Sequence, residues 1–274
     1  MKISRSQRGT RRSGVGARRH QVRARLGRAQ TAMVMAIVLG GVVVSAILLQ
    51  NERSDAHAEQ QRLAQRVSVV LAEQIGQASG VAQSARGLFE SSSLTTAAEF
   101  GHFAAVAMER SQLLGMAWAP RLTAALRAGY ERSTGLTITR LDGHRWPRGA
   151  NGGRAIAFPI TYLAPVPLLS GSVLGIDLTS NPGFPVTLAR ARDRGIVALA
   201  RPHALVGTRG FALTLSAPVY AQGAMPRTVI ERRRALRGFV FATIRADDLA
   251  ARAQAVLPAG AELQIRDAGT LVAG

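Results

Sequence analysis

Near its N-terminus the chain has a run of mostly apolar residues without a charged side chain. Between Arg28 and Glu52, residues 29–51 contain no Lys, Arg, Asp or Glu. A hydrocarbon core about 30 Å thick needs roughly 20 apolar residues in a helix, and a helix satisfies its own backbone hydrogen bonds where water is absent. The pattern predicts a transmembrane helix over residues 29–51.

An amphipathic stretch follows this run over residues 52–91. Its apolar positions recur every three or four residues, which places them on one stripe of an α-helix. They are Leu63, Val67, Leu71, Ile75, Ala78, Ala82, Ala85 and Phe89. The spacing predicts a single stalk or signalling helix of about 60 Å at 1.5 Å per residue. The stripe fits a surface that faces the protein core and a seam between two copies of the chain equally well.

The pattern beyond residue 92 alternates between helical and strand-like periods. A helix is expected to begin near Thr96, with Ser93 or Thr95 as its cap and Glu99 in its first turns. Two further helices are expected over residues 123–132 and 185–194, the second ending at Gly195. Strands are expected over residues 113–119, 136–141, 155–163, 174–178, 211–220, 236–244 and 261–265, and a loop over 142–153 carries Trp146. This mixture predicts an α+β fold.

Charge gives the apolar run a direction. Residues 1–28 hold Lys2 and nine arginines without an acidic residue, whereas Glu52, Asp55 and Glu59 follow the run. Short basic segments remain in the cytoplasm. We therefore expect residues 1–28 to be a cytoplasmic arm at a bacterial inner membrane and residues 52–274 to be periplasmic.

The N-terminus also has features of other targeting segments. A cleavable signal peptide has a shorter basic region and an apolar core of about 7 to 15 residues. Thr10-Arg11-Arg12 resembles part of a twin-arginine signal, but the apolar run begins far downstream of it. The arm has no interleaved aromatic residues, so contact with anionic lipid is favoured over nucleic-acid binding.

Composition restricts the remaining chemistry. The formal net charge is +19, of which the 25 basic and 16 acidic residues beyond the span contribute +9. The absence of cysteine excludes disulfides and cysteine-ligated metals. About 220 residues after the span are enough to bury a hydrophobic core in one large or two small lobes.

No motif indicates catalysis. The five histidines are scattered without the spacing of metal ligands: His20, His57, His102, His144 and His203. The glycines of 149–153 lack the strand-then-helix context of a phosphate-binding loop. Asp247 and Asp248 are expected to cap a helix from Leu249, and Arg232-Arg233-Arg234 to form a solvated turn. We expect no catalytic residue, metal or cofactor in this chain.

Eight short motifs occur in register between residues 86 and 249. They are Arg86-Gly87-Leu88-Phe89, Glu99-Phe100, Trp118-Ala119-Pro120-Arg121, Phe158-Pro159-Ile160-Thr161-Tyr162, Gly175-Ile176-Asp177-Leu178, the run 189–195, Ala217-Pro218-Val219-Tyr220 and Leu236-Arg237-Gly238-Phe239-Val240. In order and spacing this region resembles a CHASE domain, the extracellular sensor module of many histidine kinases and diguanylate cyclases.

The resemblance implies a long N-terminal helix followed by tandem PAS-like sensor lobes. It further implies a small ligand in the membrane-distal lobe and a homodimer formed through the stalk helix. Residues 250–274 would then be the end of the proximal lobe. Relatives in this family usually return through a second membrane helix to a cytoplasmic output domain, so we expect this chain to be a fragment of a longer protein, with a partner that carries the signal as the alternative.

Polar and aromatic side chains on the expected strands are the candidates for ligand binding, because small-molecule sites combine apolar walls with a few placed polar groups. They are Trp118, Phe158, Tyr162, Asp177, Thr214 and Tyr220. Each also fits a role in the core. Asp177 is flanked by Ile176 and Leu178, so its carboxylate needs donors, either from Arg190 or Arg192 or from a ligand.

Plant relatives bind cytokinins, and an acidic residue shortly before the aromatic-proline pair belongs to their pocket. The corresponding stretch here is Arg154-Ala155-Ile156-Ala157-Phe158-Pro159, which has no carboxylate. An adenine amino group would lose its acceptor there, at a cost of about 1 to 3 kcal/mol. Arg154 instead suggests an anionic or carbonyl-bearing ligand.

Two functions follow from the sequence. The first is a membrane-anchored sensory module that binds a small extracytoplasmic molecule and passes the signal to a histidine kinase or diguanylate cyclase domain. The second is a periplasmic interaction or scaffold module that binds no ligand. Ligand-dependent thermal stabilisation would distinguish them.

Overall fold

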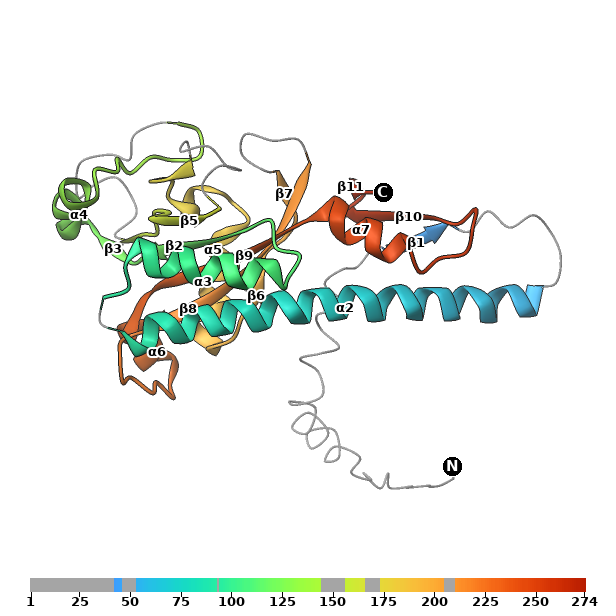
Figure 1. The fold of residues 1–274 in the computed structure, drawn as a ribbon, viewed down its shortest axis with the longest axis horizontal. Coiled ribbons are helices and arrows are strands. Elements are labelled where there is room, and N and C mark those ends of the chain that lie inside the picture. The colour runs from blue at the N-terminus through green and yellow to red at the C-terminus, as the bar shows by residue number, and fades with distance from the viewer. Residues whose placement is uncertain (1–41, 46–52, 93, 144–155, 166–172, 205–209) are drawn as a thin grey trace, which may run out of the picture. The chain divides into compact units, whose positions relative to one another are not determined.

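The structure is a computed structural model that describes residues 42–45, 53–92, 94–143, 156–165, 173–204 and 210–274 (Figure 1). The helices are α2 (Arg53–Ser91), α3 (Ala97–Glu109), α4 (Arg127–Thr134), α5 (Phe184–Arg194), α6 (Val229–Ala235) and α7 (Ala246–Gln254), with 3₁₀ turns at Ala124–Leu126 and Leu178–Ser180. The strands are β1 (Val42–Ser45), β2 (Gly115–Pro120), β3 (Leu122–Thr123), β4 (Ile156–Ala157), β5 (Tyr162–Ala164), β6 (Ala198–Leu199), β7 (His203–Ala204), β8 (Phe211–Tyr220), β9 (Leu236–Arg245), β10 (Glu262–Asp267) and β11 (Thr270–Ala273).

An antiparallel sheet forms the centre of the fold. Its strand order is β5-β2-β9-β8-β6, and β7 also pairs with β8. The long strands β8 and β9 lie side by side, with Thr214 opposite Thr243 and Ser216 opposite Phe241. Because successive side chains of a strand point to opposite faces, this register places Thr214 and Thr243 on one face and Leu215 and Ala242 on the other. The predicted α+β class is confirmed.

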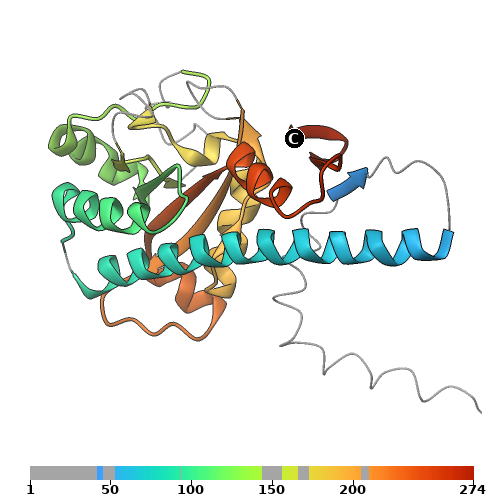
Figure 2. The same cartoon turned by 45° about the vertical axis from the view of Figure 1, so that its right-hand side comes forward.

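Helix α2 covers one face of this sheet (Figures 1 and 2). All eight stripe positions named above are at most 2% exposed, and α2 packs against β8, β9 and α7. The predicted helix is confirmed, and so is its core-facing stripe. Since this chain already buries the stripe, a seam with a second copy would need another face of α2.

Local capping explains where α3 begins. Thr96 is the N-cap: its hydroxyl accepts from the backbone N–H of Glu99 at 3.2 Å, and the Glu99 carboxylate accepts from the backbone N–H of Thr96 at 2.7 Å. This reciprocal arrangement is a capping box. The cap is therefore Thr96 rather than the expected Thr95, while Ser93 lies outside the described residues.

Three of the expected strands are wrong in their extent. Residues 136–141 form no strand and contribute a single bridge, between Thr139 and Ile176. The expected strand over 155–163 is two short strands, β4 and β5, separated by Pro159, which lacks the N–H that a ladder needs. Residues 174–178 make only bridges and lead into the 3₁₀ turn at Leu178–Ser180.

Two predictions near the C-terminal half are corrected as well. Arg232-Arg233-Arg234 lies in α6 rather than in a turn, because Thr228 and Glu231 form a second capping box at its start. Helix α7 begins at Ala246, so Asp247 and Asp248 lie in its first turn instead of preceding it. Acidic residues there interact favourably with the helix dipole.

The predicted membrane span lies mostly outside the described residues. Its four described residues, Val42–Ser45, form strand β1, which pairs with β10 in the three-stranded sheet β1-β10-β11. The three consecutive valines of β1 favour extended structure through their branched side chains. Within the described ranges, no helix has the length and apolar character required to cross a membrane.

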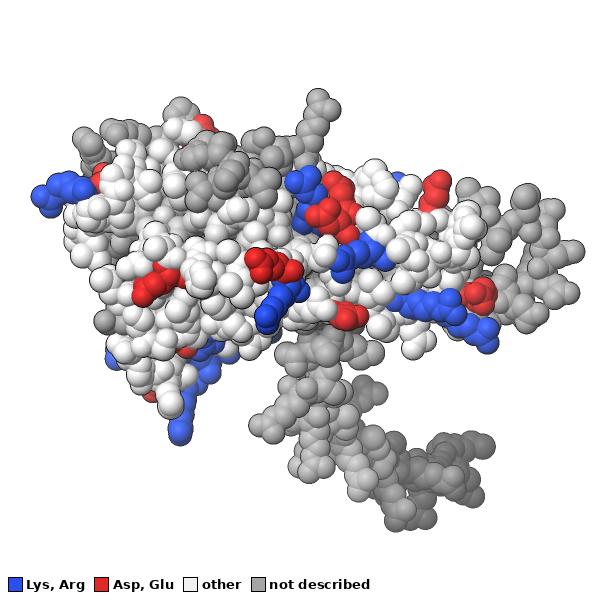
Figure 3. Space-filling view, viewed as in Figure 1, with Lys and Arg blue, Asp and Glu red and all other residues white. Residues whose placement is uncertain are grey.

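Charged side chains of both signs are interspersed on the face of the molecule shown in Figure 3. Along α2, Arg62 lies 3.6 Å from Glu59 and Arg86 lies 2.9 Å from Glu90. On this face the positive balance is not gathered into a basic patch.

Candidate ligand site

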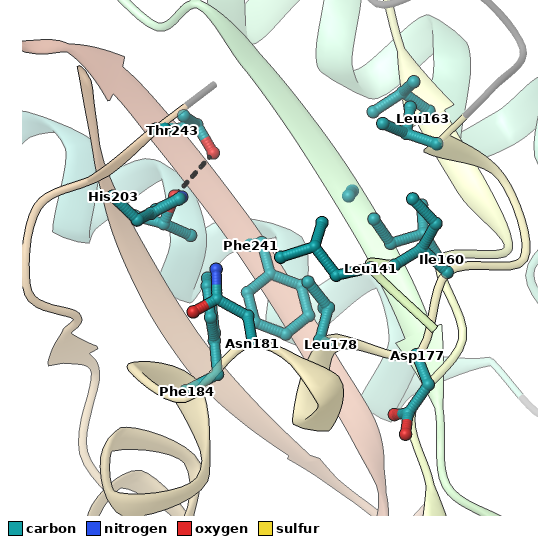
Figure 4. A pocket seen from close by; sticks show the side chains of 15 residues that line it. Leu141, Ile160, Leu163, Asp177, Leu178, Asn181, Phe184, His203, Phe241 and Thr243 are labelled. Carbon is teal, nitrogen blue, oxygen red and sulfur yellow. Dashed lines mark hydrogen bonds between the residues drawn. The ribbon is translucent and has the colours of Figure 1, made fainter. Parts of the chain in front are cut away.

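A cavity of about 110 Å³ lies on the sheet face opposite α2 (Figure 4). The register explains its side: Trp118 stacks on Phe89 of α2 at 4.1 Å, so its neighbour Ala117 points to the other face and lines the cavity. The described residues that complete the lining are Leu141, Ile160, Leu163, Val173, Ile176, Asp177, Leu178, Asn181, Phe184, His203, Ala204, Thr214, Phe241 and Thr243. The walls are therefore mainly apolar.

Three polar side chains converge at one end of the cavity. Thr214 Oγ1 lies 3.1 Å from Thr243 Oγ1 and 3.4 Å from His203 Nε2. His203 Nδ1 lies 3.2 Å from the carbonyl oxygen of Arg201, which can only accept. The Nδ1–H tautomer satisfies that contact, so Nε2 accepts from Thr214 and Thr214 accepts from Thr243. With the hydrogen bonds arranged in this way, lone pairs of the Thr243 and Thr214 hydroxyls are available to a bound molecule.

His203 is held uncharged by its surroundings. Burial lowers the pKa of its imidazole below the ordinary value near 6.5, and the carbonyl of Arg201 opposes this only in part. The ring packs edge-on against Phe184 at a centroid distance of 5.1 Å. At neutral pH the site therefore presents a neutral imidazole.

Asn181 supplies a hydrogen-bond donor. Its Oδ1 accepts from the backbone N–H of Gly183 at 3.0 Å, which orients the amide so that its nitrogen points into the cavity (Figure 4). The cavity thus contains an acceptor group around Thr243 and a donor at Asn181.

Asp177 borders the cavity, but its carboxylate turns away from it (Figure 4). The side chain is fully buried. Oδ1 accepts from the backbone N–H groups of Phe158 (2.8 Å) and Thr179 (3.1 Å), and Oδ2 accepts from the Thr179 hydroxyl (2.5 Å). The predicted partners Arg190 and Arg192 are wrong: they bind the carbonyl of Leu199 and the carboxylate of Asp193.

The other candidates from the sequence lie apart from the cavity. Phe158 packs edge-on against Phe239 at 5.0 Å. The Tyr162 hydroxyl donates to the carbonyl of Thr95 at 3.1 Å, on the side of α3, and the Tyr220 hydroxyl donates to the carbonyl of Arg192 at 2.7 Å. Trp118 faces α2, as described above, and Arg154 lies outside the described residues. Of the proposed set, the structure brings Thr214 and Asp177 to the cavity.

Sequence reasoning missed His203, Thr243 and Asn181. Thr243 carries the same signal that identified Thr214, namely a hydroxyl between apolar neighbours on a strand. His203 is one of five scattered histidines, and nothing in its local sequence distinguishes it from the other four. Among the described residues, no group of three or more His, Cys, Asp or Glu side chains is arranged to hold a metal ion.

The fold is a mixed α+β domain with a mainly apolar cavity on one face of its central sheet. A sequence model of the CHASE domain matches residues 93–273, so the chain belongs to the CHASE domain family. The match extends beyond residue 249, where the motif-based resemblance ended, and includes β10 and β11.

Two solved structures match this chain, and the first is similar to it in fold. The ligand-binding domain of the Pseudomonas aeruginosa PAO1 amino acid chemoreceptor PctC, in complex with GABA, is 12% identical with a TM-score of 0.50, over 81% of this chain and 77% of that one. A protein described as methyl-accepting chemotaxis protein X is 15% identical with a TM-score of 0.36, over 76% of this chain and 66% of that one. No curated protein sequence matches this chain.

Proposed function

We propose that this chain is the sensory part of a membrane-anchored signalling protein, and that the cavity between β9 and α5 receives a small extracytoplasmic molecule. The single observation that carries this proposal is a mainly apolar cavity with converging polar groups inside a sensor-family fold. The structural neighbour that binds GABA is consistent with a small-molecule ligand.

The position of the cavity suggests how binding is transmitted. Thr214 and Thr243 belong to β8 and β9, and the opposite faces of these strands pack on α2. A ligand that draws the two strands toward α5 changes the surface on which α2 rests. Such a switch requires that the ligand bind one arrangement of strands and helix more tightly than the other.

The C-terminal end of α2 is tied to the same strands. Arg237, at the start of β9, donates to the carbonyls of Phe89 and Ser92, both at 3.1 Å. Glu90 accepts from the backbone N–H of Tyr220, at the end of β8, at 3.0 Å. These contacts give a route by which displacement of β8 and β9 moves the helix.

The remaining parts of the proposal rest on sequence. Residues 29–51 would anchor the chain in the inner membrane with residues 1–28 in the cytoplasm, an arrangement in which residues 42–45 give up their pairing with β10. A histidine kinase or diguanylate cyclase domain would receive the signal. A second copy of the chain would associate through an α2 face other than the buried stripe.

A ligand screen on the full 274-residue chain tests the central claim. A library of small organic molecules is assayed by thermal unfolding, since a ligand stabilises the folded state with the logarithm of its concentration over Kd. The same library is applied to Ala117→Leu, which places three extra carbon atoms in the cavity. Stabilisation of the wild type that disappears in Ala117→Leu supports the proposal. No stabilisation by any compound would favour the interaction-module alternative.

A further inference from the structure

We infer that the cavity selects an uncharged, mainly apolar molecule carrying one group that both donates and accepts hydrogen bonds, such as a hydroxyl or a primary amide. This inference rests on the proposed function of the cavity and specifies the chemical class of its ligand. It distinguishes this chain from a sensor of amino acids.

The cavity offers no free charge on its described lining side chains. Among the described lining residues, the ionisable side chains are Asp177 and His203. Both oxygens of Asp177 already accept hydrogen bonds from Phe158 and Thr179, and its carboxylate turns away from the cavity. A buried charge without a partner is strongly unfavourable. A carboxylate, an ammonium group or a zwitterion would find no counter-charge on these side chains.

The imidazole of His203 is already hydrogen-bonded within the protein. His203 donates through Nδ1 to the carbonyl of Arg201 and accepts through Nε2 from Thr214. Both nitrogens are therefore engaged within the protein, and burial disfavours the protonated ring. The imidazole of His203 is therefore uncharged in the cavity and accepts a hydrogen bond from Thr214.

Thr243 and Asn181 present hydrogen-bonding groups to the cavity. Thr243 donates its hydroxyl hydrogen to Thr214, which leaves its lone pairs as acceptors. The Asn181 amide nitrogen points into the same cavity as a donor. A hydroxyl or an amide on the ligand matches this pair, because it donates to Thr243 and accepts from Asn181.

The remaining walls of the cavity are apolar, and its volume is large enough for a small organic molecule. Ile160, Leu178, Phe184 and Phe241 line the body of the cavity. Its volume of about 110 Å³ is several times the roughly 10 to 15 Å³ that one water requires by the same kind of measure. The body of the ligand is accordingly apolar, and burying it supplies the affinity.

Matched pairs of small molecules test this inference on the full chain by thermal unfolding and isothermal titration. Benzyl alcohol is compared with toluene and with benzoate, and isovaleramide with isovalerate; γ-aminobutyrate is included as a zwitterion. We expect benzyl alcohol to bind about tenfold more tightly than toluene, since one net hydrogen bond of about 1.4 kcal/mol corresponds to a factor of ten. We expect no stabilisation by benzoate, isovalerate or γ-aminobutyrate.

Protein variants provide the second arm. Thr243→Val keeps the volume and removes the acceptor, and should weaken benzyl alcohol binding about tenfold while leaving toluene unchanged. Thr187→Val makes the same change at a buried threonine of α5 that does not line the cavity, and should leave binding of both compounds unaltered. Equal binding of benzyl alcohol and toluene to the wild type would overturn the inference without requiring any variant to fold.

The outcomes separate this inference from the proposal on which it rests. If the ionised compounds stabilise the wild type but not Ala117→Leu, the cavity is a ligand site and the inference of a neutral ligand is wrong. If neither series binds and the broader library also has no effect, the proposed function fails together with the inference.

Discussion

At the scale of single residues, Asp177 shows what a fully buried carboxylate needs. Its side chain is 0% exposed, yet three donors from Phe158 and Thr179 satisfy it. Oδ1 accepts from the backbone N–H groups of Phe158 and Thr179. The Asp177 side chain therefore connects the residue that follows β4 to the 3₁₀ turn at Leu178–Ser180. The sequence indicated that Asp177 required donors, but the donor from Phe158 lies 19 residues away and depends on the folded loop.

We expect Asp177→Leu to lower the free energy of unfolding by about 2 to 5 kcal/mol, because it leaves two buried N–H groups without an acceptor. Asp177→Asn should lower it by less than about 1 kcal/mol. The amide oxygen can accept from both backbone N–H groups, and the Thr179 hydroxyl can accept from the amide nitrogen instead of donating. Urea denaturation measures both values, with Asp248→Leu on the exposed start of α7 as the control. Equal losses in the two Asp177 variants would contradict this account.

His203 should make stability depend on pH. Burial lowers its pKa in the folded state, so the unfolded chain binds the proton more readily. This contribution is fully present above the ordinary pKa near 6.5 and is lost as the pH falls below it. We expect the unfolding temperature to fall more steeply between pH 7.5 and 5 in the wild type than in His203→Gln. Parallel curves for the two proteins would argue against an imidazole that the fold keeps neutral.

Ser216 offers a residue-level test of packing on the cavity side of the sheet. Its hydroxyl is buried and has no hydrogen-bond partner among the described residues, which costs free energy that an alanine would not incur. We expect Ser216→Ala to raise the free energy of unfolding by up to about 1 kcal/mol in urea denaturation. Thr214→Val, which breaks the contacts with His203 and Thr243, should lower it; a loss of stability in Ser216→Ala would show that its hydroxyl is satisfied.

At the scale of elements, prediction succeeded where the signal was local. The stripe of α2 and the αL glycine that ends α5 are encoded within a few turns, and β8 matches its predicted bounds. It failed for residues 136–141, whose alternating pattern matches a strand but which receive only one bridge. Alternation with a period of two shows that one face of a segment is apolar. Whether the segment becomes a strand depends on a neighbouring strand, which distant parts of the chain must supply.

The bonds from Arg237 to the end of α2 should matter for stability. The last carbonyls of a helix lack partners within it, and Arg237 binds those of Phe89 and Ser92. We expect Arg237→Met to lower the free energy of unfolding by about 1 to 3 kcal/mol. Arg234→Met, on an exposed position of α6, should change it by less than about 0.5 kcal/mol. If the two variants change the free energy of unfolding equally, the hydrogen bonds of Arg237 to the end of α2 do not stabilise the fold.

Close contact between β2 and β9 makes Gly238 irreplaceable. A β-carbon at Gly238 would collide with the Ala119 carbonyl and the Trp118 ring, whereas one at Gly80 on α2 would meet open space. We expect Gly238→Ala to destabilise the protein by about 1 to 3 kcal/mol or more. Gly80→Ala should stabilise it by up to about 1 kcal/mol through helix propensity. Calorimetric unfolding measures both, and a destabilised Gly80→Ala would indicate that α2 contacts a second copy there.

At the scale of the whole molecule, the class of fold and the family were accessible from sequence, whereas the site was not. The cavity is assembled from β2, β7, β8, β9 and the segment around Asn181, which lie up to about 130 residues apart in the chain. Thr214 was identified because its own strand is distinctive. Asn181 and His203 became candidates only when the strand order brought them beside it.

Membrane topology is a prediction at this scale. We expect alkaline phosphatase fused after Gly274 in a bacterial host to be active and green fluorescent protein at the same position to be dark, because the basic arm keeps the N-terminus inside. Deleting residues 29–51 should reverse both signals. Cytoplasmic fluorescence from the intact chain would contradict the proposed orientation.

The unbroken burial along α2 has a mechanical consequence. A helix of 39 residues is about 58 Å long at 1.5 Å per residue, and its stripe is held from Leu63 to Phe89. It therefore acts as a stiff lever: a tilt of about 1° at the cavity end moves the other end by about 1 Å over this length. A small tilt of α2 caused by a ligand in the cavity would therefore move the N-terminal end of α2, near residue 52, by a distance that a neighbouring domain can detect.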